Sequence, residues 1–436
     1  MENRLQTENE LTQNLLDFID ASPTMFHATA SCKKLLEEQE FVALNPGAAW
    51  NLKEGGKYYT TINDSCIIAF CINSTDIEKE GFKIIGTHND VPGFRIKPNA
   101  QMQTENYIKL NTEGYGGGIL STWFDRPLSV AGRVSLKSND LLRPETRLVD
   151  LNKPILIIPS LAIHMNREVN QGVALNKQKD TLPILTYTHE KVSTSLMLEL
   201  LADALKVEAL DILDADLYLY PYEKSMCVGL KEEFISAPRL DDLSITYGGL
   251  YALLNNSSQK GVSMFVCYDN EEVGSNTKQG ADAPFLVRVL ERIMIALGKT
   301  SREAFFMALE NSFMISGDVA HLAHPNYMEK SDPTNKVLPG KGPAIKVNAN
   351  FNYTTDSDSY AVFAGICKAH EIPFQVFVNR SDERGGSTIG PVANAHLGIR
   401  SVDVGSPMLA MHSARELMAK SDFIYTAQAL KAFFSI

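Results

Sequence analysis

The chain has 436 residues, of which 44% are hydrophobic and 21% are charged, and its formal net charge at pH 7 is −11. A globular protein of this length exceeds one ordinary hydrophobic core, so we expect roughly two or three structural units. The acidic balance argues against nucleic acid or an anionic membrane as the main partner, because both attract basic surfaces.

Signals for export or membrane insertion are missing from the sequence. No apolar run approaches the roughly 18 residues of a membrane span, and the first residues lack the apolar stretch of a signal peptide. The six cysteines, at positions 32, 66, 71, 227, 267 and 367, show no CxxC spacing. We therefore expect a cytoplasmic protein with reduced cysteines, whose metal ligands, if any, are histidines and carboxylates.

The first part of the chain predicts helices followed by strands. Residues 7–41 have the apolar spacing of two helices, which are separated at Ser22-Pro23. Strands are expected at 58–62, 66–72 and 82–85. The third of these strands runs into the polar residues of the segment Thr87-His88-Asn89-Asp90.

The pattern of predicted elements changes between residues 95 and 236. Short apolar strands are expected at 128–136, 155–158 and 217–220, with one helix at 194–205 and turn-rich segments between them. This pattern indicates a separate, mainly β domain with its own core.

Helices and strands alternate from Pro238 to the end of the chain. Helices are predicted near 242–254, 284–297, 356–370, 407–417 and 422–434, and strands at 262–267, 313–316, 374–378 and 401–404. Such alternation indicates an α/β fold, with a mixed sheet covered by helices on both faces. We expect residues 1–94 and 237–436 to form one catalytic α/β domain, into which residues 95–236 are inserted.

The predicted strand 262–267 is followed by a dense acidic segment. Asp269, Glu271 and Glu272 come directly after it, and Gly274 then allows the chain to turn. Ligands of open α/β sheets lie beyond the carboxyl ends of the strands. Adjacent glutamates on an extended backbone point in different directions, so one could bind a metal while the other handles a proton. Taken alone, an acidic run is more often a solvated loop.

Five places carry metal-type ligands near strand ends or helix starts. They are His88 with Asp90, Asp241 or Asp242, Glu271 with Glu272, Asp318, and His412. Each has an ordinary alternative, such as a surface turn, a helix N-cap or a core histidine. Together, two imidazoles and three or four carboxylates suit two divalent cations, zinc first, with cobalt or manganese as substitutes.

This ligand set predicts hydrolysis of an amide bond. One carboxylate that bridges two metals would hold a water between them, ready to attack a carbonyl carbon. A carboxylate that is not a ligand must then accept the proton of the water and deliver it to the leaving amine. The pair Glu271-Glu272 would supply a ligand and a base in adjacent residues.

Several segments resemble the M18 metallopeptidases, the group of aspartyl aminopeptidase and aminopeptidase I. The segments are Thr87-His88-Asn89-Asp90, Pro238-Arg239-Leu240-Asp241-Asp242-Leu243, Asp269-Asn270-Glu271-Glu272-Val273-Gly274-Ser275, Ser316-Gly317-Asp318-Val319-Ala320-His321 and Met408-Leu409-Ala410-Met411-His412-Ser413. Tyr115-Gly116-Gly117-Gly118 and Ile158-Pro159-Ser160-Leu161-Ala162-Ile163-His164 are also similar to the family. The resemblance runs from about residue 20 to the C-terminus in the order of the family, and it favours a bacterial member.

The resemblance implies a role for each candidate residue. His88, Asp241 and Asp318 would hold one zinc, and Asp241, Glu272 and His412 the other. Glu271 would be the general base, Asp90 would orient His88, and Asp242 would only begin a helix.

The resemblance also implies an assembly. The inserted domain would dimerise, and the dimers would form a dodecamer. His164 would reach the site of a neighbouring subunit to bind substrate, and His321 would line the same pocket.

The preferred N-terminal residue is left open by the sequence. The resemblance aligns Lys346 with a lysine that faces the first side chain of the substrate, where it would favour Asp or Glu. The loop 381–390, however, differs from that of the animal enzymes and looks like that of bacterial members, so acidic selectivity does not follow automatically.

Two other functions compete with peptide aminopeptidase activity. A deacylase or carboxypeptidase could use the same metals, but it would need a cation for the carboxylate of its substrate. A catalytically silent assembly or cargo-binding protein is disfavoured, because every expected ligand and the base are present.

Overall fold

The computed structural model describes residues 2–436, with side chains from residue 6 onward. The contacts divide the chain into two units: the first runs to Asp90 and includes Ser225–Met411 and Glu416–Ile436, and the second comprises Val91–Lys224 and His412–Arg415. The expected insertion at 95–236 thus extends 12 residues too far, since residues 225–236 belong to the first unit. The reason is that β12 (Phe234–Ala237) pairs with β20 (Glu416–Ala419) there.

The first unit contains a nine-stranded mixed sheet. Its strand order is β1 (Val42–Ala43), β2 (Lys57–Ile62), β3 (Cys66–Ile72), β13 (Val262–Tyr268), β4 (Phe82–His88), β14 (Phe313–Gly317), β18 (Arg400–Gly405), β16 (Ala344–Lys346) and β17 (Gln375–Phe377). The neighbours β13, β4, β14 and β18 are parallel to one another. Their carboxyl ends therefore lie along one edge of the sheet.

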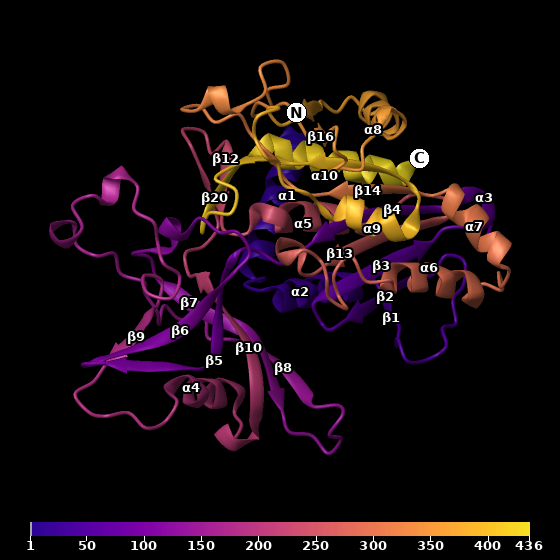
Figure 1. The fold of residues 1–436 in the computed structure, drawn as a ribbon. Coiled ribbons are helices and arrows are strands. Elements are labelled where there is room, and N and C mark those ends of the chain that lie inside the picture. Colours follow the sequence, from indigo (N-terminus) through magenta and orange to yellow (C-terminus); the bar gives the residue numbers. More distant parts are fainter. Residues whose placement is uncertain (1) are drawn as a thin grey trace. The chain divides into compact units, whose positions relative to one another are not determined.

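Helices cover both faces of this sheet, as the sequence predicts (Figure 1). One face packs against α1 (Glu2–Asp20), α2 (Met25–Glu38), α5 (Leu240–Leu254), α8 (Ser357–Ala369) and α10 (Lys420–Ser435). The other packs against α6 (Phe285–Ala296), α7 (Arg302–Glu310) and α9 (Ile389–Leu397), and the short α3 (Ile77–Glu80) contributes Ile77. Because side chains of β13 are buried on both faces, the strand is a continuous apolar run in the sequence.

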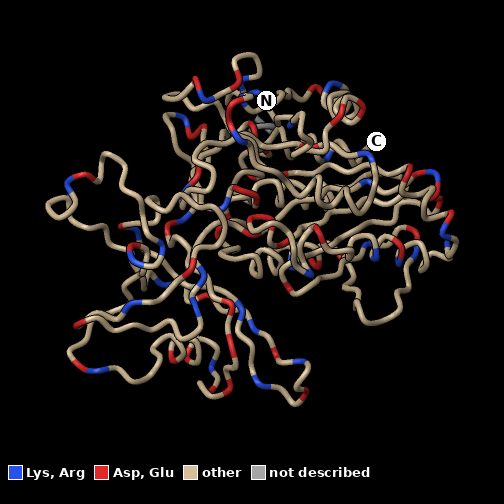
Figure 2. Tube along the Cα trace, viewed as in Figure 1, with Lys and Arg blue, Asp and Glu red and all other residues tan. Residues whose placement is uncertain are grey.

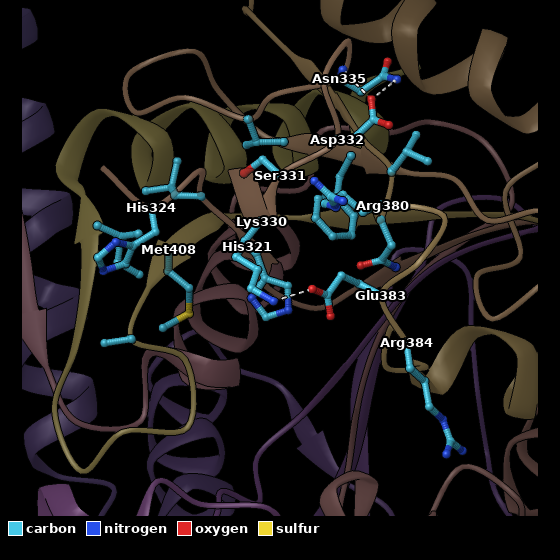
Figure 3. Close-up of a pocket in the computed structure, with 17 residues that line it drawn as sticks. His321, His324, Lys330, Ser331, Asp332, Asn335, Arg380, Glu383, Arg384 and Met408 are labelled. Carbon is cyan, nitrogen blue, oxygen red and sulfur yellow. Dashed lines mark hydrogen bonds and ion pairs between the residues drawn. The ribbon is translucent and has the colours of Figure 1, made fainter. Parts of the chain in front are cut away.

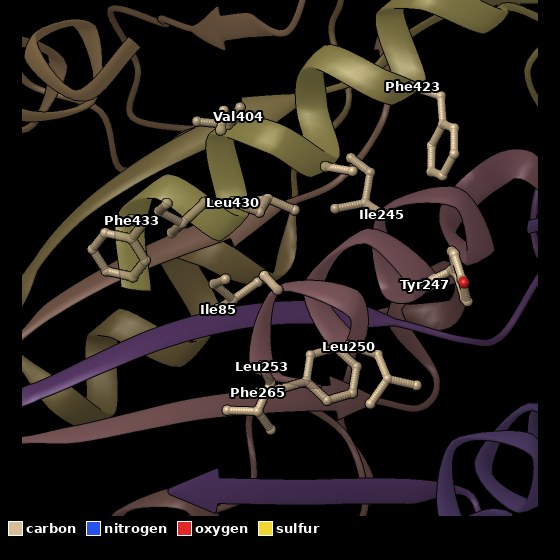
Figure 4. Close-up of a cluster of buried hydrophobic side chains, with 14 of the residues drawn as sticks. Ile85, Ile245, Tyr247, Leu250, Leu253, Phe265, Val404, Phe423, Leu430 and Phe433 are labelled. Carbon is tan, nitrogen blue, oxygen red and sulfur yellow. The ribbon is translucent and has the colours of Figure 1, made fainter. Parts of the chain in front are cut away.

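The core between α5, α10 and the sheet is made of large apolar side chains (Figure 4). Leu250 and Leu253 of α5, Leu430 of α10 and Phe265 of β13 belong to this core, and each is at most 1% exposed. Full burial of such a side chain stabilises the fold by about 1.5–3 kcal/mol. This packing holds the start of α5, which carries Asp241 and Asp242, against the edge of the sheet.

The predicted helix at 407–417 is wrong. The chain instead forms β19 (Pro407–Leu409), a turn, and β20, which pair antiparallel in a five-stranded sheet of order β11 (Met226–Val228), β12, β20, β19 and β15 (Ala320–His321). Ala410 and His412 have φ angles of 56° and 66°, in the left-handed region that a right-handed helix cannot include. Burial of the strand residues Met408 and Met418 explains the apolar pattern that we interpreted as a helix.

The second unit is built on an antiparallel sheet of order β8 (Glu145–Asp150), β7 (Leu128–Leu136), β10 (Ile212–Pro221), β5 (Gly93–Thr104), β6 (Tyr107–Tyr115) and β9 (Ile184–Tyr187). One helix, α4 (Leu196–Leu205), packs its buried residues Met197 and Leu201 into the same core. The strand expected at 155–158 forms only isolated bridges, Leu128 with Leu156 and Ile157 with Ile184.

Lysine and arginine are scattered along both units, interspersed with aspartate and glutamate (Figure 2). Across residues 2–436, none of the helices is both long and apolar enough to cross a membrane. The six cysteines are free, and all except the half-buried Cys227 are buried.

Candidate metal centre

The predicted ligands of the first unit meet at the carboxyl edge of its parallel strands. His88 is the last residue of β4, and Asp318 directly follows β14. His88, Asp241, Asp242 and Asp318 each offer a donor atom, and these atoms lie within 4.8 Å of one another. His88 forms a second such group with Glu271 and Glu272.

The geometry around His88 fits a metal better than a set of hydrogen bonds. Its Nε2 atom lies 3.5 Å from Asp241 Oδ1 and 3.8 Å from Asp318 Oδ1, which is too long for a good hydrogen bond. Ligand atoms about 2.0–2.1 Å from a tetrahedral zinc are about 3.3–3.4 Å apart, close to these separations. The other ring nitrogen, Nδ1, lies 3.1 Å from the backbone oxygen of Asp90, which leaves Nε2 to face the carboxylates.

Negative charge is concentrated in a buried space. Burial raises the pKa of Glu271 to about 7 and the pKa values of Glu272 and Asp242 well above their ordinary range. Burial opposes the charge on His88, yet the carboxylates of Asp241 and Asp318 raise its pKa well above the ordinary value. The metal-free protein therefore retains protons that a bound dication would displace.

Asp90 supports the acidic segment as well as His88. Glu271 and Glu272 lie in a short 3₁₀ turn, Glu271–Val273, and not on the extended backbone that we expected. The backbone N–H of Glu271 donates to Asp90 Oδ1 at 2.9 Å, and that of Glu272 donates to Oδ2 at 3.1 Å. One carboxylate thus fixes the backbone of both glutamates.

Asp242 contributes more than a helix start. It is 0% exposed, and its Oδ2 accepts the backbone N–H of His88 at 3.2 Å. Its Oδ1 has no hydrogen-bond partner among the described residues. Sequence reasoning missed this contact, because the only available signal was the adjacency of Asp242 to Asp241.

Lys346 is buried beside a candidate ligand. It is 3% exposed, and its Nζ lies 3.2 Å from Asp318 Oδ2 and 5.4 Å from the ring centre of Tyr353. Burial opposes charge on Asp318, but the Lys346 ammonium keeps the pKa of Asp318 below its ordinary value. The lysine therefore neutralises Asp318 in this state, and its pairing with an acidic substrate stays a prediction.

His321 lines a cavity of about 330 Å³ in the first unit (Figure 3). The loop 381–390 reaches this cavity through Glu383 and Arg384, and Glu383 forms a 2.5 Å ion pair with Lys330. Other lining residues are Leu322, His324, Ser331, Asp332, Asn335, Val337, Phe377, Val378, Asn379, Arg380, Met408, Leu409 and Ala410. The cationic members of this set, Lys330, Arg380 and Arg384, were not recognised in the sequence.

His164 and His412 belong to the second unit. His164 is exposed in a short 3₁₀ turn, Ile163–Met165, and His412 Nδ1 lies 3.2 Å from the backbone oxygen of Gly117. The backbone oxygen of His412 also accepts the N–H of Ile119. Their roles in metal and substrate binding stay predictions.

Comparison with known proteins identifies the family of the chain. The sequence profile of the aminopeptidase I zinc metalloprotease (M18) family matches residues 18–434. A probable M18 family aminopeptidase 2 from Clostridium novyi (strain NT) is 53% identical, with 100% of both chains covered. In the cryo-EM structure of the Ape4 and Nbr1 complex, a similar chain is 36% identical with a TM-score of 0.94, over 98% of this chain and 86% of that one.

The S. cerevisiae mApe1 dodecamer supplies a further similar structure. It is 28% identical, with a TM-score of 0.84, over 98% of this chain and 97% of that one. The chain belongs to the aminopeptidase I zinc metalloprotease (M18) family, and its activity is that of a metallo-aminopeptidase.

Proposed function

We propose that the protein removes N-terminal residues from peptides with two zinc ions in each subunit, for which cobalt or manganese can substitute. The observation that carries the proposal is the position of His88 Nε2, at 3.5 Å from Asp241 and 3.8 Å from Asp318. His88, Asp241 and Asp318 would hold one ion. Asp241, Glu272 and His412 would hold the other, and Asp241 would bridge the two.

Glu271 is the proposed general base. The bound metals would lower the pKa of a water and stabilise negative charge on the carbonyl oxygen of the substrate. Glu271 would accept the proton of that water and give it to the leaving amine. The backbone N–H of Glu271 donates to Asp90, which holds this base in place.

The substrate contacts come from several segments. His321 would line the pocket for the peptide, and Lys346 would favour an acidic first residue if its ammonium leaves Asp318 and pairs with the side-chain carboxylate of the substrate. We propose that the protein is a cytoplasmic homo-oligomer in which the second unit mediates dimer contacts. The dodecameric S. cerevisiae relative supports a dodecamer. We propose that it is built from six dimers, in which His164 would reach a neighbouring site.

One observation favours a competing activity. Three cations line the cavity beside His321, and a carboxypeptidase or deacylase needs one for the carboxylate of its substrate. Lys330 pairs with Glu383 and Arg380 with Asp382, so Arg384 is the cation that fits this role. Family membership favours the aminopeptidase, and the two activities differ in which end of the peptide must be free.

A panel of peptides separates these activities. The full-length protein, stripped with a chelator and reloaded with zinc, cobalt or manganese, is assayed on peptides that differ in their first residue. Matched peptides carry an acetylated N-terminus or an amidated C-terminus. We expect metal-dependent release of the first residue, abolished by acetylation and retained after amidation. Cleavage of the acetylated peptides, or full activity without metal, would contradict the proposal.

A further inference from the structure

We infer that Glu416 is a positioning residue, whose carboxylate holds the backbone of Asp241 in the orientation that metal binding requires. The inference rests on the proposed function, because it takes Asp241 to be the ligand shared by two metals. Glu416 does not belong to either donor group around His88 in the first unit, so its effect can be separated from direct coordination.

The local backbone explains why Asp241 needs such support. Asp241 lies at the start of α5 with φ −81° and ψ 110°, which is not a helical conformation. The first N–H groups of a helix have no acceptor within it. Glu416 supplies one, since its Oε2 accepts the N–H of Asp241 at 3.1 Å.

Glu416 is itself held firmly. It is the first residue of β20, it is 3% exposed, and it pairs with Ala237 of β12. Ala237 precedes Asp241 by four residues, so the strand pairing and the carboxylate fix both ends of this short connection.

The same arrangement recurs at the other proposed site residues. Asp242 accepts the backbone N–H of His88, and Asp90 accepts those of Glu271 and Glu272. Buried carboxylates thus hold the backbone at His88, Glu271 and Glu272 as well as at Asp241. Asp242 and Asp90 each lie close to His88, however, so a substitution at either would also change the charge beside the metal. Glu416 offers the cleaner test.

The expected consequence concerns both metals. Loss of a group that orients a metal ligand typically lowers metal affinity or activity by about 10–100-fold. Because Asp241 is the proposed bridge, a change in its orientation should weaken the two ions together. Glu416→Ala removes the acceptor, whereas Glu416→Gln keeps an oxygen that can accept the same N–H.

The test measures zinc binding without reference to activity. The full chain is purified as wild type, Glu416→Ala and Glu416→Gln, and zinc affinity is determined by competition with a chelator, with metal content per subunit as a second readout. Asp422→Ala is the matched control. Asp422 is also a buried carboxylate that accepts backbone N–H groups, those of Gly340 and Gly342, and it lies outside the metal cluster.

We expect zinc affinity to fall about 10–100-fold in Glu416→Ala, for both ions, and much less in Glu416→Gln. Asp422→Ala should lower the unfolding temperature but leave zinc affinity near that of the wild type. Unchanged affinity in Glu416→Ala would overturn the inference, and so would an equal loss in the Asp422→Ala control or in Glu416→Gln. If Glu416→Ala does not fold, Glu416→Asp replaces it, because the shorter side chain withdraws the acceptor from the N–H of Asp241. Glu416→Asp should then lose more zinc affinity than Glu416→Gln, and an equal affinity in the two would overturn the inference. A wild type that binds no zinc would instead refute the proposed function.

Discussion

In the acidic segment after β13, the position relative to His88 separates residues that look equivalent in the sequence. Glu271 and Glu272 share a donor group with His88, whereas Asp269 does not belong to it. Asp269 is 2% exposed and accepts the N–H of Asn270 at 2.7 Å, and burial raises its pKa to about 7. Asp269 therefore supports the turn, whereas Glu271 and Glu272 are the proposed base and metal ligand.

The first prediction distinguishes the base from the ligand. Glu271→Gln should lower kcat by about 100-fold or more, because the amide cannot accept the proton of the attacking water. Its metal content, measured by elemental analysis, should stay at the wild-type level. Glu272→Gln is the matched variant, and it should lose metal as well as activity. Near-normal turnover in Glu271→Gln would refute its assignment as the base.

The second prediction concerns Lys346. Lys346→Ala should reduce kcat/KM on all substrates, because Asp318 loses the ammonium that lies 3.2 Å from its Oδ2. If Lys346 also binds the first side chain, peptides with N-terminal Asp or Glu should lose about tenfold more than Leu peptides. Lys330→Ala, at an exposed lysine of the cavity, serves as the control. Equal losses on acidic and Leu peptides would dismiss the charge-pairing idea.

At the level of elements, the sequence predicts buried strands well and short segments poorly. The strands β3 and β13 are continuous apolar runs, because both of their faces are covered. The sequence analysis does not predict the helices α7 and α9. In α9 the reason is the pair Gly390 and Pro391, which usually indicates a turn. At 407–417 the sequence analysis predicts a helix that does not form. The apolar residues of this segment belong to two strands, which are separated by a turn with positive φ angles.

The start of α9 provides the third prediction. A Cβ atom on Gly390 would lie 2.6 Å from Asp403 Oδ2 and 2.8 Å from Ser316 Oγ. Asp403 is 0% exposed and accepts the hydroxyls of Ser316 and Thr388, so it cannot move freely. Gly390→Ala should therefore destabilise the protein by about 1–3 kcal/mol.

A second glycine serves as the control for this prediction. Gly365 lies on the exposed side of α8, where an added Cβ meets nothing within 4 Å. Gly365→Ala should stabilise the protein by about 0.5–1 kcal/mol, because alanine loses less conformational entropy in a helix. Urea unfolding of both variants in the presence of a chelator measures the two effects without a contribution from bound metal. Similar changes in both would contradict the packing argument.

At the scale of the whole molecule, the site depends on residues that are far apart in the chain. The strand ends at His88 and Asp318 come together because β4 and β14 are parallel neighbours. The start of α5 joins them through the hydrogen bond of Asp242 to the backbone of His88. Periodicity can predict each strand, but it cannot predict which strands are neighbours. The position of each candidate ligand after an apolar run indicates that the residues form one site. The role of each residue in that site follows only from the resemblance to the M18 family.

The last prediction tests whether His164 acts across a subunit interface. His164 is exposed in the second unit, and the proposed dimer would bring it to the site of the neighbouring subunit. His164→Ala and Glu271→Gln homo-oligomers should both be nearly inactive. In a mixed dimer of the two, one site has both defects and the other has neither.

In the proposed dodecamer, random mixing of equal amounts makes half of the dimer pairs mixed, so about a quarter of wild-type activity per subunit should return. If the protein forms dimers alone, purification through both tags leaves only mixed dimers, and about half should return. Co-expression with two affinity tags, followed by purification through both, provides the mixed oligomers, and activity per subunit is compared with that of each parent. A mixed Glu271→Gln and Glu272→Gln oligomer is the control, because both residues lie in the same subunit's site and every site then carries one of the two defects. That control should stay inactive. If the His164→Ala mixture also fails to recover activity while its parents remain assembled, His164 does not act in the neighbouring site.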